Sequence, residues 1–331
     1  MKAYLVSKYK SPIQAGEAAE PTVGDRDVLV EIHAAGVNML DAKIRDGEFK
    51  LFLPYKAPFI LGHDLAGVVT RIGSAVTRFT VGDEVYARPR DGRIGTFAQR
   101  IALDEADVAI KPVDLSMAEA ASVPLVALTA WQALVERANL QPGQKVLIHA
   151  GSGGVGTYAI QLAKHLGATV TTTTGTSNFE WVRDLGADVV IDYRTQDFET
   201  VDHDYDVILD SQGGDTLAKS LRVLKPGGVA IGIAGPPDPD FARQRELGLP
   251  LRLAMTLLSL NTRRSARHRG VRFSFLFMRA SGAQLGEITK LIETNVLQPI
   301  VDRTYPFDET PQALAHVEAG RTKGKVVITT L

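Results

Sequence analysis

The sequence contains no cysteine among its 331 residues. Disulfides, thiolate zinc sites and cysteine nucleophiles are therefore excluded, and the composition is compatible with a reducing compartment. The sequence also lacks an excess of charge, because 37 basic residues face 38 acidic ones and the formal net charge is −1. Such a balance gives no overall attraction to nucleic acid or to an acidic membrane, so any preference for a partner must come from a local site.

Long apolar runs are missing as well. The first residues, "MKAYLVSKYKSP", do not contain the uninterrupted apolar core of a signal peptide. The longest apolar stretch, residues 247–260, is interrupted by Pro250 and Arg252 and falls short of the ~20 residues that span a bilayer. We therefore expect a soluble, cytoplasmic protein with no transmembrane segment.

The pattern of short apolar segments changes along the chain. Up to about residue 110, often alternating segments are separated by Gly, Pro and Asp, which predicts a compact antiparallel β domain. From residue 145 to 235, apolar strands alternate with helical stretches, which is typical of a parallel doubly wound sheet. A helix is predicted between the two regions, beginning at a capping box made by Ser116 and Glu119.

A glycine-rich stretch, "KVLIHAGSGGVGT", occupies residues 145–157 between a predicted strand and a predicted helix. Gly151, Gly153 and Gly156 match GxGxxG: the first allows a tight turn, the second a close approach to pyrophosphate, and the third close packing of helix on strand. The helix N-terminus then offers free N–H groups to phosphate. We expect a dinucleotide site in preference to a turn with no ligand, formed by Gly151, Ser152, Gly153, Gly154, Val155 and Gly156.

The choice between NAD and NADP depends on the end of the next strand. NAD-binding domains carry an acidic residue there, about 20 residues past the glycines, but residues 169–178 read "TVTTTTGTSN". Thr176, Ser177 and Asn178 offer neutral hydrogen bonds, and Tyr193 with Arg194 adds a phenol and a positive charge. We therefore expect NADP(H), although residues 170–178 contain no Arg or Lys to hold a 2′-phosphate.

Several further motifs, together with the glycine loop, resemble one known family. These are "AAGVNMLDAKIRDG" (34–47), "PFILGHDLAGVV" (58–69), "SVPLVALTAWQAL" (122–134) and "GRTKGKVVI" (320–328). Over nearly its whole length the chain resembles the zinc-independent quinone oxidoreductase (zeta-crystallin-like) branch of the medium-chain dehydrogenase/reductases.

The resemblance implies an α/β protein with two domains. A GroES-like antiparallel β-barrel domain would comprise residues 1–121 and 296–331, and a Rossmann doubly wound parallel sheet residues 122–295. It also implies a homodimer, for which the apolar segment "FSFLFM" (273–278) is the candidate edge.

Zinc alcohol dehydrogenases of the same superfamily hold their catalytic metal with Cys, His and Cys. Here Asn38 stands at about the first position, the third has no cysteine, and only His63 remains. His63 with Asp64 cannot complete a tetrahedral site, so we expect no metal and a packed, hydrogen-bonded histidine. Without a Lewis acid to stabilise an alkoxide, hydride addition to a quinone or an α,β-unsaturated carbonyl is the more plausible chemistry. The resemblance implies the same substrates.

The resemblance also suggests roles for individual residues. Asn38 would lie beside the nicotinamide and substrate, with a simple turn residue as the alternative, and Thr129 would contact the nicotinamide end, with a plain helix hydroxyl as the alternative. Lys325 would return to the cofactor phosphates or be a solvated lysine. The pocket for adenosine or nicotinamide would be lined by Gly213, Ala234, Phe275 and Phe277, of which the phenylalanines could equally be core. Asp41 and Lys43 are expected to be local structural partners. No general acid is evident, so the proton would come from solvent.

Two other functions remain open at this point. One is alcohol dehydrogenation, and the other is a non-catalytic NADPH-binding scaffold or nucleic-acid-binding protein that uses the basic segment between Arg263 and Arg272. We expect no nucleic acid partner, because a solvated helix end and loop explain that segment more simply.

Overall fold

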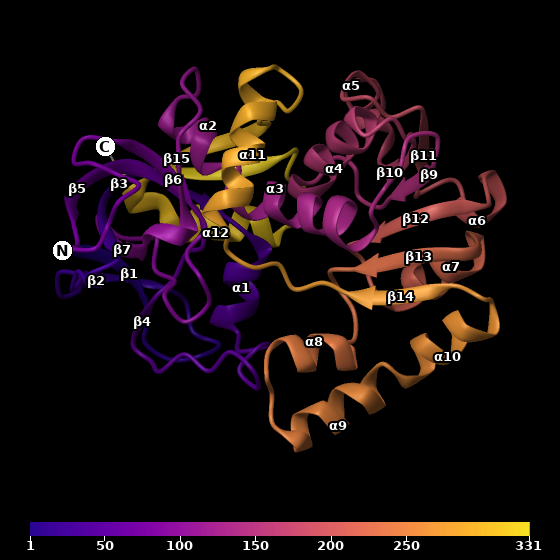
Figure 1. Cartoon of the computed structure of the whole chain (residues 1–331), viewed down its shortest axis with the longest axis horizontal. Helices are drawn as coiled ribbons and strands as arrows, with labels where there is room; N and C mark the ends of the chain where they lie inside the picture. The colour runs from indigo at the N-terminus through magenta and orange to yellow at the C-terminus, as the bar shows by residue number, and fades with distance from the viewer. Residues whose placement is uncertain (331) are drawn as a thin grey trace. The chain divides into compact units, whose positions relative to one another are not determined.

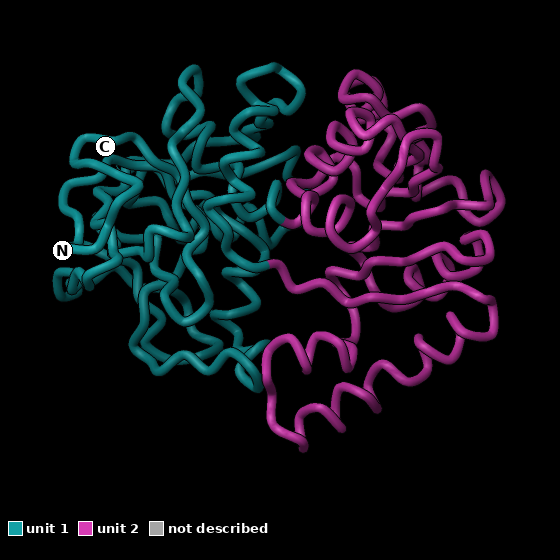
Figure 2. Tube along the Cα trace, viewed as in Figure 1, with its two compact units in different colours: residues 1–128, 279–331 teal, residues 129–278 magenta. Residues whose placement is uncertain are grey.

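The computed structural model describes residues 1–330, and its contacts divide the chain into two compact units (Figures 1 and 2). The first unit consists of Met1–Leu128 and Arg279–Leu331, and the second of Thr129–Met278. These divisions differ from the boundaries at 121/122 and 295/296 that the sequence suggested. The sequence also suggested that the second unit is inserted between two segments of the first. The contacts place residues 279–295 with the first unit.

The first unit is built on two sheets. A seven-stranded sheet has the order β15-β16-β3-β5-β6-β8, with β7 also paired to β3, and a three-stranded sheet has the order β2-β1-β4. Pairing is antiparallel except between β15 and β16, which are parallel. The strands are β1 (Lys2–Val6), β2 (Gln14–Glu17), β3 (Asp27–Val37), β4 (Phe59–Ile60), β5 (Leu65–Ile72), β6 (Glu84–Ala87), β7 (Arg100–Asp104), β8 (Val108–Ile110), β15 (Val301–Pro306) and β16 (Lys325–Thr329).

Helices cover the first unit. The predicted capping box is confirmed: the Ser116 hydroxyl accepts from the Glu119 N–H, and the Glu119 carboxylate accepts from the Ser116 N–H. One helix explains the shifted boundary, because Tyr86 of β6 donates to the Leu285 carbonyl at 2.8 Å and a Cβ on Gly282 would lie 2.2 Å from the Val108 carbonyl oxygen. The helices are α1 (Met39–Arg45), η1 (Glu105–Asp107), α2 (Met117–Ala121), α11 (Gly282–Glu293), η4 (Phe307–Glu309) and α12 (Thr310–Glu318).

The second unit contains the predicted doubly wound sheet. Its strands are all parallel and lie in the order β11-β10-β9-β12-β13-β14, so the winding reverses beside β9, the strand that precedes the glycine loop. Ligands of such sheets bind at the carboxyl ends of the strands where the order reverses. The strands are β9 (Lys145–Ile148), β10 (Thr169–Thr174), β11 (Val189–Asp192), β12 (Tyr205–Asp210), β13 (Leu224–Gly232) and β14 (Arg272–Phe275).

The helices of the second unit lie on both faces of this sheet (Figure 1). They are η2 (Gln132–Arg137), α4 (Gly154–His165), η3 (Thr176–Asn178), α5 (Phe179–Asp184), α6 (Phe198–Val201), α7 (Gly214–Val223), α8 (Pro239–Gln244), α9 (Leu249–Leu258) and α10 (Leu260–His268), while α3 (Pro124–Trp131) runs across the division between the units.

The strand expected at 273–278 is shorter than predicted, because β14 ends at Phe275, whose N–H is bound by the Asp238 carboxylate at 2.9 Å. It is one of the two edge strands of its sheet, the other being β11. Within residues 1–330, no helix combines the length and the apolar character needed to cross a membrane.

Candidate cofactor and substrate sites

The glycine loop joins the end of β9 to the start of α4. Ala150 takes up a positive φ of 55°, which is unusual for a residue with a side chain, and its carbonyl accepts from the Gly153 N–H at 3.0 Å. Gly153 is the N-cap of α4, a helix of 12 residues. The first N–H groups of a helix have no partner within it, so this end of α4 presents the donors and the positive dipole end that bind phosphate.

The three glycines of the motif lack a side chain for different reasons. A Cβ on Gly151 would lie 2.1 Å from the Thr172 hydroxyl, and a Cβ on Gly156 would lie 2.3 Å from the Ala150 carbonyl oxygen. For Gly153 the nearest atom is the Ala150 oxygen at 3.4 Å, and its φ of −84° suits any residue. The fold therefore requires glycine at 151 and 156, whereas at 153 the protein itself leaves room for a side chain. A bound pyrophosphate would fill that room.

A line of hydrogen bonds connects the loop with the segment expected to contact the adenosine ribose. The Thr174 hydroxyl at the end of β10 donates to Ser152 Oγ at 2.9 Å, and the Asn178 amide donates to Thr174 Oγ1 at 3.2 Å. Ser152 and Asn178 were predicted from the sequence. Thr174, which holds them together, was one of four consecutive threonines that the sequence did not distinguish.

Arg194 supplies the positive charge that residues 170–178 lack. Its guanidinium carbon lies over the Tyr193 ring at 5.5 Å from the centroid and would be 3.6 Å from a Cβ on Gly175. Gly175 directly precedes the exposed side chains of Thr176 and Ser177. The structure thus brings Tyr193 and Arg194 to the segment 176–178, and a contact of either side chain with a 2′-phosphate stays a prediction.

A carboxylate, Asp192, also lies at this place. It accepts hydrogen bonds from the Thr176 hydroxyl and, at 2.9 Å, from the Arg194 N–H, and the bond from Thr176 is the main reason that the pKa of Asp192 is lowered. The sequence analysis had found no acid near the end of β10. Asp192 reaches that region from the end of the neighbouring strand β11, where its charge is stabilised by donors of the protein.

Gly213 and Ala234, at the ends of β12 and β13, lie in contact. Gly213 has a φ of +69°, and a Cβ there would be 2.4 Å from the Ala234 carbonyl oxygen. The Asp210 carboxylate fixes the turn by accepting from the Gly213 N–H at 2.6 Å, while burial raises the pKa of Asp210. That Gly213 and Ala234 lie beside the cofactor stays a prediction.

Phe275 and Phe277, the two phenylalanines expected at the pocket, belong to an aromatic cluster of the second unit. Phe241 packs edge-on against Phe275 at a centroid distance of 5.3 Å and lies 6.0 Å from Phe277. Phe275 is buried and Phe277 is partly buried. This packing agrees with the core alternative, and a contact of either ring with the cofactor stays a prediction.

His149, at the junction of β9 with the glycine loop, is buried among neutral groups. Its Nε2 lies 2.9 Å from Ser220 Oγ and its Nδ1 lies 3.2 Å from Thr173 Oγ1. The Ser220 hydroxyl donates to the Thr216 carbonyl at 2.8 Å, so it accepts from His149, which fits a neutral ring protonated at Nε2. Burial lowers the pKa of His149 to about 4.

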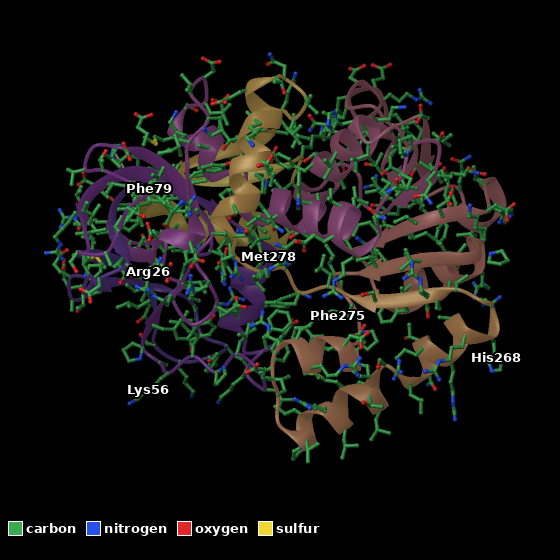
Figure 3. All side chains as sticks on the ribbon, viewed as in Figure 1. Arg26, Lys56, Phe79, His268, Phe275 and Met278 are labelled. Carbon is green, nitrogen blue, oxygen red and sulfur yellow. The ribbon has the colours of Figure 1, made fainter. Side chains whose placement is uncertain are left out.

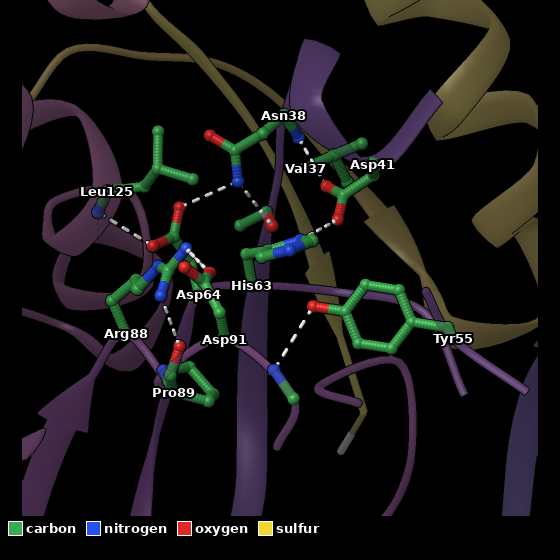
Figure 4. A network of polar contacts seen from close by, with 12 residues as sticks. Val37, Asn38, Asp41, Tyr55, His63, Asp64, Arg88, Pro89, Asp91 and Leu125 are labelled. Carbon is green, nitrogen blue, oxygen red and sulfur yellow. Dashed lines mark hydrogen bonds and ion pairs between the residues drawn. The ribbon is translucent and has the colours of Figure 1, made fainter. Parts of the chain in front are cut away.

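In the first unit, Asn38 lies in a buried network of charged side chains (Figure 4). Its Nδ2 donates to Asp64 Oδ2 at 2.9 Å and, in a longer contact, to the Gly36 carbonyl at 3.4 Å. The ammonium of Lys325 donates to Asn38 Oδ1 at 2.5 Å, to Asp64 Oδ2 at 3.1 Å and to the Val37 carbonyl at 3.0 Å. The second Asp64 oxygen accepts from the Leu125 N–H at 2.7 Å.

These bonds define the geometry of both predicted residues. Lys325 is 3% exposed and directs its three donors to the protein, so the predicted contact with cofactor phosphates would require that one of these bonds be exchanged. Asn38 is held by Asp64 and Lys325, and its second N–H makes only the 3.4 Å contact, which leaves that N–H as the group most easily given to a substrate oxygen. Thr129, in α3, is buried.

His63 and Asp41 form a second buried pair next to this network. The Nδ1 of His63 lies 2.6 Å from Asp41 Oδ1, while Asp41 Oδ2 accepts from the Asn38 N–H at 2.7 Å. Both side chains are fully buried. Asp41 thus joins the start of α1 to His63, in keeping with its expected structural role and with a packed histidine.

Two family models match this chain. Residues 24–114 match the alcohol dehydrogenase GroES-like domain, and residues 185–328 match a model described as zinc-binding dehydrogenase. The residues present do not fit zinc: the chain has no cysteine, and among residues 1–330 no three His, Asp or Glu side chains gather in a group able to hold a metal ion.

Individual proteins are similar over nearly the whole chain. The mouse mitochondrial NAD(P)H oxidoreductase RTN4IP1 is 35% identical over 325 residues, which cover 91% of this chain and 81% of that protein. The chloroplastic NADPH-dependent alkenal/one oxidoreductase of Arabidopsis thaliana is 33% identical and covers 93% and 73%. The quinone oxidoreductase structure from Coxiella burnetii superposes with a TM-score of 0.88 at 29% identity and covers 100% and 99%.

These findings define an oxidoreductase with a GroES-like domain and a Rossmann-type nucleotide domain. The chain belongs to the medium-chain dehydrogenase/reductase superfamily, in its zinc-independent quinone oxidoreductase branch.

Proposed function

We propose that this protein is an NADPH-dependent, zinc-independent reductase of quinones or α,β-unsaturated carbonyls. The observation that carries the proposal is that the protein has room for a side chain at Gly153, the N-cap of α4. A Cβ there would lie 3.4 Å from its nearest neighbour. A glycine that packing does not require, at a helix N-terminus after the first strand of a doubly wound sheet, is explained by the close approach of a pyrophosphate.

Residues 151–156 would hold the pyrophosphate through backbone N–H groups. Thr176, Ser177 and Asn178 would bind the adenosine ribose, with Tyr193 and Arg194 at its 2′-phosphate. NADPH, when bound, would supply a hydride, which carries both electrons of the reduction, to the substrate. Names of relatives support this choice, since the Arabidopsis protein is called NADPH-dependent.

The side chains of the first unit would act on the substrate oxygen. As hydride bonds to the β carbon of an enone, the C=C electron pair moves toward the carbonyl, and negative charge collects on its oxygen. We propose that the second N–H of Asn38 donates to that oxygen, exchanging its 3.4 Å contact with Gly36. Lys325, 2.5 Å from Asn38 Oδ1, would polarise the amide and so strengthen this bond. Thr129 would orient the nicotinamide end.

No side chain is assigned as the proton donor, so the α carbon would take its proton from water. With deuterated NADPH the label should appear at the β carbon, and in deuterium oxide at the α carbon. Solvent label at the β carbon would contradict direct hydride transfer.

The first experiment measures NADPH and NADH oxidation with a quinone panel and an enone panel after chelator treatment. Turnover that resists the chelator and prefers NADPH is expected, and the better panel identifies the substrate class. Gly153→Val should abolish NADPH binding, whereas Gly248→Val should leave it unchanged, because Gly248 is also an N-cap glycine with extended backbone, and a Cβ there would meet nothing closer than the Pro250 ring at 3.9 Å. Tight NADPH binding by Gly153→Val, with the variant folded, would overturn the site.

We also propose a homodimer and a cytoplasmic location. The edge strand β14 would pair with its copy, so sedimentation should give twice the chain mass, and a monomer would refute the pairing. Two of the similar proteins are named as mitochondrial and chloroplastic, and cell fractionation decides the location.

A further inference from the structure

Helix α9 turns its apolar side outward, the reverse of the usual pattern for a surface helix. Leu249, Leu253, Leu257 and Leu258 are 73%, 64%, 69% and 62% exposed. At helical spacing, the first three form a single stripe and Leu258 flanks the same half of the helix, which also carries Pro250. Thr256, which is half-buried, borders the stripe beside Leu249.

The opposite side of α9 meets the protein. Met255 is 2% exposed, and Ser259, at the end of the helix, is fully buried and donates from its hydroxyl to the Met255 carbonyl at 2.8 Å. The outward leucines are therefore not the by-product of a helix that is loosely attached. They form a continuous apolar face on a helix whose other side is packed.

The chain around this face is strongly basic. No acidic residue occurs between Glu246 and Glu287, a span that holds Arg252, Arg263, Arg264, Arg267, Arg269, Arg272 and Arg279 together with His268. Within residues 1–330, the five arginines from 263 to 272 form no ion pair. A chain with a net charge of −1 thus concentrates unpaired positive charge in one segment.

The apolar face and the basic segment are continuous. α10 begins directly after α9 at Ser259, whose carbonyl accepts from the Arg263 N–H at 2.9 Å, and the two helices run one after the other below β14 (Figure 1). Arg264, Arg267 and Arg269 are exposed, and the exposed His268 projects from the end of α10 (Figure 3). We call the outward residues of 249–272 the α9–α10 surface.

We propose that the α9–α10 surface docks this protein on an anionic lipid bilayer. The leucines of α9 would enter the boundary between headgroups and acyl chains, and the arginines of α10 would bind lipid phosphates. An apolar helix face flanked by unpaired basic residues is the combination that holds a helix in the plane of a membrane surface.

The same observations disfavour the other possible occupants. Nucleic acid would explain the arginines, but its phosphates give no reason for four exposed leucines on the adjoining helix. A second copy of the chain would cover the leucines, but a two-fold contact centred on this surface would bring two arginine segments of the same sign together.

The experiment measures flotation of the full-length protein with vesicles of phosphatidylcholine alone and with an equimolar mixture of phosphatidylcholine and phosphatidylglycerol. Binding to the mixed vesicles that weakens with salt is expected. Leu253→Gln/Leu257→Gln should reduce the partition coefficient at least about tenfold. Arg264→Gln/Arg267→Gln should reduce it by about fivefold for each arginine.

Matched controls come from the first unit. Val81 and Val113 are 62% and 77% exposed, so Val81→Gln/Val113→Gln removes an equal number of exposed apolar side chains. Arg71 and Arg321 are exposed, and Arg71→Gln/Arg321→Gln removes the same charge. Both control variants should bind vesicles as the parent does, and urea unfolding should show all four variants folded.

Several results would overturn the proposal. One is no binding to mixed vesicles at low salt, and another is binding that the leucine variant retains in full. If duplex DNA binds more tightly than the vesicles and the leucine variant keeps that affinity, the surface is a nucleic-acid site. If the leucine variant converts a dimer to a monomer and the parent ignores vesicles, it is an interface between copies of the chain. The docking does not depend on turnover, so an inactive protein that binds vesicles would leave it standing.

Discussion

The two candidate sites differ in the groups that they offer to a ligand: one offers neutral dipoles and the other offers buried charges. In the second unit the glycine loop offers backbone N–H groups and hydroxyls, and its buried histidine, His149, is neutral. In the first unit, Asp64 and Lys325 form a buried ion pair around Asn38. The cofactor carries permanent negative charge on its phosphates, and N–H dipoles that are already oriented can bind that charge. The substrate becomes charged only during the reaction, and charged side chains that are already in place can stabilise that charge as it develops.

Removal of one member of the buried ion pair should have the largest effect. Lys325→Met leaves the Asp64 carboxylate buried without its ammonium, and breaking such a pair costs about 3 to 5 kcal/mol of unfolding free energy. Urea unfolding measures the loss. Lys323→Met, two residues earlier and exposed, should change stability by less than about 0.5 kcal/mol. The double variant Lys325→Met/Asp64→Asn should recover part of the lost unfolding free energy, because it removes the unpaired carboxylate. If Lys325→Met is as stable as the parent, the ion pair does not contribute to the stability of the first unit.

The contrast also explains what the sequence could reveal. The glycine loop is local: strand, glycines and helix follow one another within 145–165, and both the doubly wound sheet and the position of the loop were predicted correctly. The network in the first unit joins Asn38, Asp64 and Lys325 across up to 287 residues. No spacing rule connects such positions, so Asp64 was considered only as a failed metal ligand and Lys325 only as a phosphate or surface residue.

Neighbouring strands caused the same difficulty in the second unit. Asp192 reaches the segment 176–178 because β11 lies beside β10, and its carboxylate was missed although Tyr193 and Arg194, which follow it, had been named for this site. The contacts of α11 with β8 and β6, such as that of Tyr86 with Leu285, also join positions far apart in the sequence, and they group residues 279–295 with the first unit.

The neutral state of His149 can be tested by pH. Its pKa falls from 6.5 to about 4 on folding, so the unfolded chain binds the proton more readily and stability is lost as pH falls from 6.5 toward 4. Between about pH 7 and about pH 4.5, this group should cost about 2 to 3 kcal/mol. His149→Gln should reduce the pH dependence of urea unfolding by that amount. His165→Gln, which alters an exposed histidine, should leave it unchanged, and an equal slope in all three proteins would contradict a neutral buried ring.

The two glycines at 153 and 156 separate packing from binding within one loop. Gly156→Ala places a Cβ 2.3 Å from a backbone oxygen and should destabilise the protein by about 2 kcal/mol. Gly153→Ala meets nothing closer than 3.4 Å and should stay within about 1 kcal/mol of the parent while it weakens NADPH binding. Thermal unfolding and fluorescence titration measure the two properties. Equal stability losses together with unchanged NADPH affinity for Gly153→Ala would show that Gly153, like Gly156, is required by packing and not by the cofactor.

Arg194 is an exception to the contrast between the two sites, because it places a charged side chain beside the neutral groups of the second unit. Arg194→Gln removes the guanidinium over Gly175 and should weaken NADPH binding about tenfold, the loss of one charge-assisted contact to the 2′-phosphate. NADH lacks that phosphate, so its affinity should not change. Arg183→Gln, an exposed arginine on α5, provides the matched loss of charge and should affect neither cofactor. If Arg194→Gln weakens both cofactors equally, Arg194 supports the loop rather than selecting the phosphate, and the second unit would then owe its preference to the hydroxyls of Thr176 and Ser177.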